Sequence, residues 1–407
     1  MLITFQKRLV EIVLLWALIG YPLLGMYTTI TGIDNRIASV TARIVVALIC
    51  LFLITTSLSD GKFKIAKLLF FFLFLYLSRL IYDYAYQYND YALVAIQVYA
   101  SSVLIPAIAV GSYSEYLLSI QKRIVMMISF SGAIFLPAFF YAYRTGLFYT
   151  QGTDDTNVRY ASEFVNAVSL GHFTCTVAIA AFFYVIEYRP RLIELLAHAT
   201  IVVGSVAALF LSGSRAAFIG LVVASAIYAI SRPSRLLVLI PFLLSGLMYL
   251  PQDNFLVQRM SDLVIAKWDT GALARLDVQS TAIADFLDSP IIGKHFIDMN
   301  WGPGLYPHNI MIEILMALGL IGAIPLYALI GVSMYRALRF RTHLTFYAII
   351  YFVSFAFLQT SGAIWAADSL FVLTSIFLTA SKKFDPRFLT LPTGRSRTMQ
   401  RSLHAGA

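Results

Sequence analysis

One histidine in this sequence stands where a side chain can act as a base. His308 follows a turn rich in Gly and Pro and precedes Asn309 and a long apolar run, so its imidazole lies at the start of a predicted helix. A neutral imidazole, with a pKa near ~6.5, accepts a proton at neutral pH. Asn309 favours helix starts, and capping alone would explain it. His308 is therefore a candidate general base, with Asn309 in a supporting role.

Three arginines are candidates to hold an anionic substrate near this histidine. Arg159 and Arg275 fall in long polar loops, and Arg215 directly follows Ser214 in a tight turn. Guanidinium groups form paired hydrogen bonds with phosphate oxygens, so several arginines on one membrane face with a histidine suit a diphosphate. For Arg215, snorkelling to lipid phosphates is the alternative.

The sequence offers no recognisable metal motif. Cys50 and Cys175 lie midway along apolar stretches, which predicts small buried side chains rather than disulfide or zinc chemistry. Asp154 and Asp155 form an acidic pair in a loop, for which a solvated position is favoured over a cation site. We therefore expect no metal and no cofactor.

The composition shows what must position these residues. The chain has 407 residues, of which 59% are hydrophobic and only 13% charged, with a mean hydropathy of +0.79. Soluble proteins carry about a quarter charged residues, so this balance excludes an ordinary soluble domain. The net charge of +9 is distributed over short connections between apolar runs and is not taken as a sign of nucleic-acid binding.

The apolar runs predict an all-α polytopic membrane protein with about twelve transmembrane helices, because ~20 helical residues cross a bilayer. The predicted spans are 9–30, 41–58, 65–83, 92–111, 124–143, 165–187, 192–211, 216–230, 236–250, 309–335, 344–360 and 364–381. They form a single membrane domain, residues 1–381, with outer loops at 144–164 and 251–308. Lys and Arg crowd the opposite connections and the basic tail 382–407, which predicts that both termini are cytoplasmic.

Several polar residues inside these spans also need an explanation, because charge at membrane depth is costly. Arg79 and Asp83 are four residues apart, which predicts an ion pair on one helix. For Asp368 and Glu313 the sequence favours no particular role. In the second outer loop, apolar residues at helical spacing predict a short amphipathic helix near the membrane surface, ending at Asp288.

The chain resembles the O-antigen ligase and polymerase superfamily of GT-C type membrane glycosyltransferases. The most specific segment is His308-Asn309, nine residues, then Gly319-Leu-Ile-Gly322. Supporting matches are Ser214-Arg215-Ala216, Arg275 followed by Ser289-Pro290-Ile-Ile-Gly293, and Arg159 with Asn166.

This resemblance implies metal-independent, inverting transfer of a glycan from undecaprenyl diphosphate to an acceptor hydroxyl. The reaction would take place at the periplasmic face of a bacterial inner membrane. His308 would take the acceptor proton, Arg215 and Arg275 would hold the diphosphate with Arg159 as a further contact, and Ser214 and Asn309 would support them. The partners implied are membrane lipid, the lipid-linked glycan and an acceptor.

Three functions remain open at this stage. A ligase would transfer finished polysaccharide to lipid A-core, and the nine-residue spacing with one dominant outer loop favours it. A polymerase would extend a second lipid-linked glycan, and Arg159 in the loop 144–164 keeps that option open. A glycolipid flippase or transporter would need ionisable residues at mid-bilayer on broken helices and repeated halves, and neither is evident in the sequence.

Overall fold

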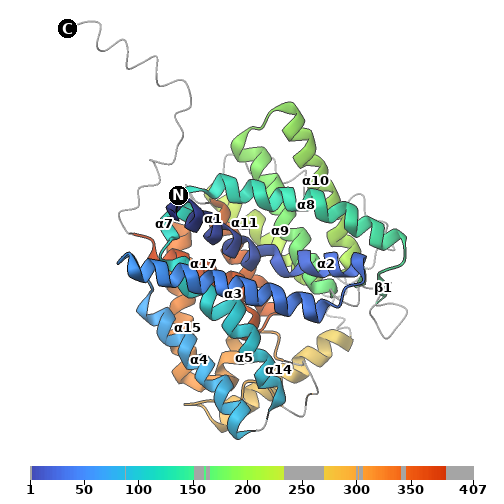
Figure 1. Cartoon of the computed structure of the whole chain (residues 1–407). Helices are drawn as coiled ribbons and strands as arrows, with labels where there is room; N and C mark the ends of the chain where they lie inside the picture. The colour runs from blue at the N-terminus through green and yellow to red at the C-terminus, as the bar shows by residue number, and fades with distance from the viewer. Residues whose placement is uncertain are drawn as a thin grey trace, which may run out of the picture.

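A computed structural model describes residues 2–87, 89–150, 160–161, 166–232, 270–298, 301, 306–340 and 345–381. Figure 1 shows an arrangement dominated by helices, as the composition predicts. The helices are α1 (Leu2–Leu15), α2 (Tyr21–Thr31), α3 (Asn35–Ser59), α4 (Lys67–Tyr86), α5 (Asp90–Val98), α6 (Ile105–Gly111), α7 (Ser114–Ser119), α8 (Gln121–Arg144), α9 (Ala167–Tyr188), α10 (Leu192–Ser212), α11 (Arg215–Ser231), α14 (Thr270–Asp288), α15 (Ile310–Phe340), α16 (Thr345–Thr360) and α17 (Asp368–Thr379).

Short irregular elements complete the described chain. Two π-helical segments, η1 (Trp16–Gly20) and η2 (Tyr99–Leu104), interrupt long helices, and a 3-10 turn, η5 (Ile364–Ala366), precedes α17. Two-residue strands β1 (Tyr149–Thr150) and β2 (Tyr160–Ala161) pair antiparallel within the first outer loop. This strand pair is the one departure from the all-α prediction in the described residues.

The helices agree with the predicted membrane spans wherever the structure describes them. Eight helical stretches are long and apolar enough to cross a membrane, and three shorter apolar helices are α11, α16 and α17. Each overlaps one predicted span. The predicted span at 236–250 lies outside the described residues, as do the basic tail 382–407, most of the loop 144–164 and part of the loop 251–308. A multi-pass membrane protein is therefore confirmed, whereas the count of twelve stays a prediction.

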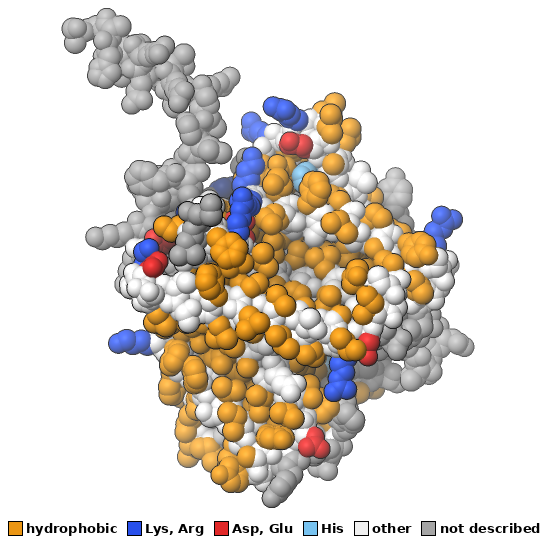
Figure 2. Space-filling view, in the orientation of Figure 1, with side chains coloured by type: hydrophobic (Ala, Val, Ile, Leu, Met, Phe, Trp, Pro, Cys, Tyr) orange, Lys and Arg blue, Asp and Glu red, His pale blue; other side chains and the backbone are white. Residues whose placement is uncertain are grey.

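The outer surface of the bundle is apolar. Figure 2 shows hydrophobic side chains over much of one face, with Lys and Arg toward its edges. Helix α3 illustrates the pattern, because Ile37, Ile44 and Leu48 are at least half exposed. Such a surface would be costly in water and is stable against lipid tails.

Two helices organise the interior. Helix α9 packs against α8, α10 and α11, and α15 packs against α4, α14, α16 and α17. The predicted tight turn before Arg215 is confirmed, since α10 ends at Ser212 and α11 begins at Arg215. Gly213 closes the turn with a φ of 62°, in the left-handed region that glycine adopts without strain.

The Gly-x-x-Gly segment predicted from the family pattern has a structural role. Gly319 interrupts α15 with φ 56° and ψ −150°. The backbone N–H groups of Leu320 and Ile321 donate to the carbonyls of Pro290 and Ile291, at 2.9 and 3.1 Å. A Cβ on Gly319 would lie 2.6 Å from the Ile291 backbone. Glycine is therefore needed where the Ser289–Gly293 segment contacts the interruption in α15.

The chain after this contact is fixed to α4. Arg79 and Asp83 form the predicted ion pair at 2.8 Å, with side chains that are 8% and 0% exposed. Arg79 also donates to the carbonyl of Lys294, and the Phe296 N–H donates to Asp83 at 2.7 Å. The pair thus positions the connection that leads from α14 toward His308.

Candidate active site

A cavity of about 810 Å³ lies among the helices that carry the predicted site. Its walls come from η1, the start of α9, α14, the segment before α15, the loop 361–367 and α16. Both breaks in long helices contribute, since Trp16–Gly20 and Ser102 of η2 line it. Its volume falls in the ~300–1,000 Å³ range of sites for small molecules or headgroups.

His308 faces this cavity from a constrained backbone. Its φ of 56° is in the left-handed region, which non-glycine residues seldom adopt. The neighbouring residues hold it there: Gln279 of α14 donates to the Pro307 carbonyl at 3.0 Å. Asn309 accepts from the N–H groups of Met311 and Ile312 at 2.9 and 3.2 Å, so it caps α15. Asn309 itself is not among the cavity-lining residues.

The environment of the His308 ring favours its neutral form. The ring lies 4.2 Å from the Tyr306 ring, centroid to centroid, and Nδ1 is enclosed without a hydrogen-bond partner. Burial, with a smaller contribution from the charge of Arg275, lowers the pKa of His308 to about 4. The unprotonated imidazole therefore persists well below neutral pH, and Nε2 is the nitrogen left to meet a substrate.

Arg275 approaches the same cavity from α14. The inward face of this helix carries Arg275, Val278, Gln279, Ala282 and Asp285, while Leu273, Leu276, Ile283 and Leu287 are 43–67% exposed. The predicted helix is thus confirmed, with four residues of its apolar stripe exposed and an inward face that combines small apolar residues with Arg275, Gln279 and Asp285. One helix carries Arg275 to the cavity and anchors the His308 segment through Gln279.

The other predicted residues do not join this pair in the described structure. Arg215 begins α11 and is not among the residues that line the cavity. Ser214 is buried at the same helix start, with its hydroxyl lacking a hydrogen-bond partner. Arg159 lies outside the described residues, and so does the acidic pair Asp154–Asp155. Asn166 lines the cavity and caps α9 through a 2.7 Å bond to the Ser169 N–H.

Several cavity residues were not predicted as site residues. They come from helices far from His308 in the chain: Arg43 of α3, His172 of α9, Trp365 of η5 and Asp368 of α17. The sequence did hold a signal for two of them, because Arg43 and Asp368 are charged residues inside predicted apolar spans. Sequence alone did not place these two residues in the same cavity.

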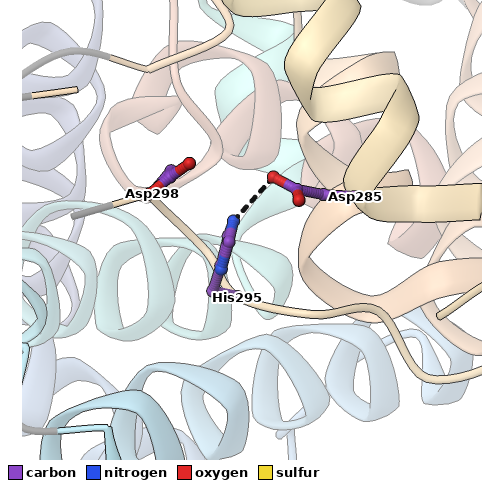
Figure 3. Close-up of side chains that lie close together, drawn as sticks. All are labelled: Asp285, His295 and Asp298. Carbon is purple, nitrogen blue, oxygen red and sulfur yellow. Dashed lines mark hydrogen bonds and ion pairs between the residues drawn. The ribbon is translucent and has the colours of Figure 1, made fainter. Parts of the chain in front are cut away.

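The structure also shows a cluster that sequence spacing missed. Ligand atoms of Asp285, His295 and Asp298 lie within 4.8 Å of one another, as metal ligands would (Figure 3). However, Asp285 already accepts from the Lys294 ammonium at 2.7 Å, and its other oxygen lies 2.9 Å from the His295 ring. Hydrogen bonds to Asp285 and Asp288 raise the pKa of Lys294. Both oxygens of Asp285 are thus already engaged by neighbouring side chains, one of them a cation.

Glu313 illustrates a buried acid with an architectural role. Its carboxylate is fully buried and accepts from the Tyr76 hydroxyl at 2.8 Å and from the Ile364 N–H at 2.9 Å. Tyr306 donates to the Ser361 carbonyl at 3.1 Å. These bonds fix the loop 361–367, which forms one wall of the cavity.

The fold and cavity define a polytopic helical membrane protein with a polar site between its helices. Residues 199–327 match the family model described as O-antigen ligase, a segment that includes Arg215, Arg275, His308 and Gly319. This match confirms the predicted resemblance over these residues, which make up less than half of the chain. No match was found among curated proteins or solved structures.

Proposed function

We propose that this protein is a glycosyltransferase that moves a glycan from undecaprenyl diphosphate to an acceptor hydroxyl at the periplasmic face of the inner membrane. The observation that carries the proposal is the convergence of Arg275 and His308 on one cavity, within the segment that matches the O-antigen ligase family. The description of the matching family, O-antigen ligase, supports ligation, for which we propose lipid A-core as the acceptor.

In the proposed reaction His308 is the general base. With the proton of the neutral ring on Nδ1, the Nε2 lone pair takes the proton of the acceptor hydroxyl. The hydroxyl oxygen then attacks the anomeric carbon from the face opposite the diphosphate, whose bond to that carbon breaks with inversion. A positioned base contributes typically ~10²–10⁴-fold to such a step.

Arg275 would stabilise the diphosphate as it leaves with both electrons of the broken bond. Its guanidinium adds positive charge beside the neutral imidazole, and a fixed donor in a site poor in water stabilises developing negative charge without rearranging. Arg215 and Arg159 remain proposed diphosphate contacts. Participation of Arg215 would require a substrate that extends beyond the described cavity, whereas Arg159 lies outside the described residues.

The acceptor decides between the two candidate functions, because ligase and polymerase share this chemistry. A deletion strain examined for surface polysaccharide separates them. Loss of all attached polymer, with long lipid-linked chains accumulating, means ligase, whereas single repeat units on lipid A-core mean polymerase. Unchanged polysaccharide with normal lipid-linked intermediates would contradict both. Complementation by the wild type, but not by an Arg275→Ala variant, ties the phenotype to the cavity.

A further inference from the structure

We propose that Arg43 and Asp368 form a sugar-binding subsite in the cavity, distinct from the Arg275 and His308 end. This inference rests on the proposed function, which it extends by assigning the hydroxyl-bearing part of a glycan to particular residues. Both side chains line the cavity, and neither belongs to the segment matched by the family model.

Arg43 is unusual among the arginines of the helical spans. It is the ninth residue of α3, so its Cα lies ~12 Å along the helix axis from the first residue. Its guanidinium makes no hydrogen bond or direct ion pair with the described part of the chain, and its nitrogens are not enclosed by protein. Its nearest recorded ring contact is Tyr21, 5.8 Å from the guanidinium carbon.

Asp368 supplies the complementary group. It begins α17 and acts electrostatically on Arg43 without a direct ion pair between them. One carboxylate oxygen accepts from the Ser369 N–H at 2.8 Å. No other described residue donates a hydrogen bond to this side chain, which lines the cavity. A charged donor and an acceptor thus face the same space with a gap between them.

The chemistry of this pair favours hydroxyls over phosphate. An ionised carboxylate repels a phosphate, whereas sugar hydroxyls both donate to carboxylates and accept from guanidinium groups. A polyol can therefore bridge the gap between Arg43 and Asp368. The other end offers Arg275 beside a neutral imidazole, which is the better place for an anion.

Aromatic rings connect the two ends. The Tyr306 ring lies 4.2 Å from His308 and 6.3 Å from Trp365, which precedes Asp368 by three residues. Sugar rings pack their apolar C–H faces on such side chains, and sites for small molecules combine aromatic walls with a few polar groups. A glycan held by Arg43 and Asp368 can therefore lie along this wall toward the base.

Binding to purified protein tests the subsite without requiring turnover. The probes are an oligosaccharide released by mild acid from the strain's own polysaccharide, and inorganic pyrophosphate. Arg43→Gln and Asp368→Asn should each weaken oligosaccharide binding roughly tenfold, the effect of one charge-assisted hydrogen bond. Pyrophosphate binding should be unchanged. Arg36→Gln, an exposed arginine of the same helix, is the matched control and should bind both probes normally.

Arg275→Ala should show the opposite pattern, with pyrophosphate binding weakened and oligosaccharide binding retained. Wild-type oligosaccharide binding by folded Arg43 and Asp368 variants would overturn the subsite, and so would loss of pyrophosphate binding in them. Asp368→Asn is nearly isosteric, so it carries the test if Arg43→Gln fails to fold. If wild-type protein binds sugar but transfers none, the proposed function fails while the subsite stands.

Steady-state transfer identifies which sugar occupies the subsite. A higher KM for the acceptor in the Arg43 variant assigns it to the acceptor glycan, and a higher KM for the lipid-linked donor assigns it to the donor glycan. A lower kcat with both KM values and oligosaccharide binding unchanged would contradict a binding role.

Discussion

Two arginines within membrane-spanning helices have opposite environments. Arg79 of α4 is 8% exposed, pairs with Asp83 at 2.8 Å and donates to a backbone carbonyl. Arg43 of α3 lines the cavity and has no direct ion pair within the described residues. A charge at membrane depth needs compensation. The protein compensates Arg79 by direct contacts and uses it for architecture. Arg43 has only the Tyr21 ring and the charge of Asp368 nearby, and in the proposed subsite a glycan supplies its hydrogen bonds.

The largest expected effect comes from breaking the internally paired charge. Asp83→Ala leaves Arg79 buried without its partner and removes the acceptor for the Phe296 N–H. Breaking a buried pair typically costs about 3–5 kcal/mol. We expect that loss in the free energy of unfolding measured in mixed micelles. Arg43→Gln is the matched control and should unfold like the wild type. If both variants were equally stable, the proposed difference between Arg79 as a structural residue and Arg43 as a ligand-binding residue would be wrong.

The second prediction concerns Arg275. Arg275→Ala should lower the transfer rate by about 10²–10³-fold, and Arg275→Lys nearly as much, because a single ammonium cannot form the paired hydrogen bonds of a guanidinium. Thermal unfolding should be unchanged, since this side chain faces the cavity. A fully active lysine variant would mean that only a positive charge is needed.

The pH dependence of transfer reports the environment of His308. Because its folded-state pKa is lowered to about 4, the neutral base persists as pH falls. We expect kcat/KM to stay constant from pH 8 to pH 5 and to fall by half only near pH 4. The lowered pKa also makes the stability of the fold depend on pH. As the pH falls from the ordinary pKa of histidine to about 4, the unfolded chain binds a proton at His308 before the folded chain does, so the free energy of unfolding decreases. A half-loss of activity near pH ~6.5 would indicate an imidazole with an ordinary pKa.

The smallest expected effect is that of a chelator. Asp285 is already engaged by Lys294 and His295, so EDTA should leave the transfer rate of purified protein unchanged. Inhibition that added divalent cation reverses would contradict this expectation. If EDTA also inhibited an Asp285→Asn variant, Asp154 and Asp155 would become the candidate cation ligands.

Hydropathy predicted most of the fold because lipid demands long apolar helices, and the eight long and three short apolar helices fall on predicted spans. The Arg79–Asp83 pair was predictable because four residues place both side chains on one helix face. Gly319 was recognised by its spacing, but its left-handed backbone and its bonds to the segment before His308 were visible only in three dimensions.

The candidate site was only partly predictable for the same reason. His308 and Arg275 were recognised by residue type and family spacing, and they do line one cavity. Arg43 and Asp368 join them only because α3 and α17 are packed around that cavity. Local spacing carries no information about such a distant encounter. The left-handed φ of His308 was equally invisible, although strained residues of this kind often mark functional sites.

The most direct test of the account is single-turnover glycan transfer by His308→Asn in proteoliposomes. Asparagine tolerates the left-handed backbone that position 308 requires and does not titrate near neutral pH, so the variant isolates the loss of the base. We predict a folded, inserted protein whose transfer rate is lower by about 10²–10⁴-fold. Transfer at the wild-type rate would show that His308 is not the base and would contradict the central claim.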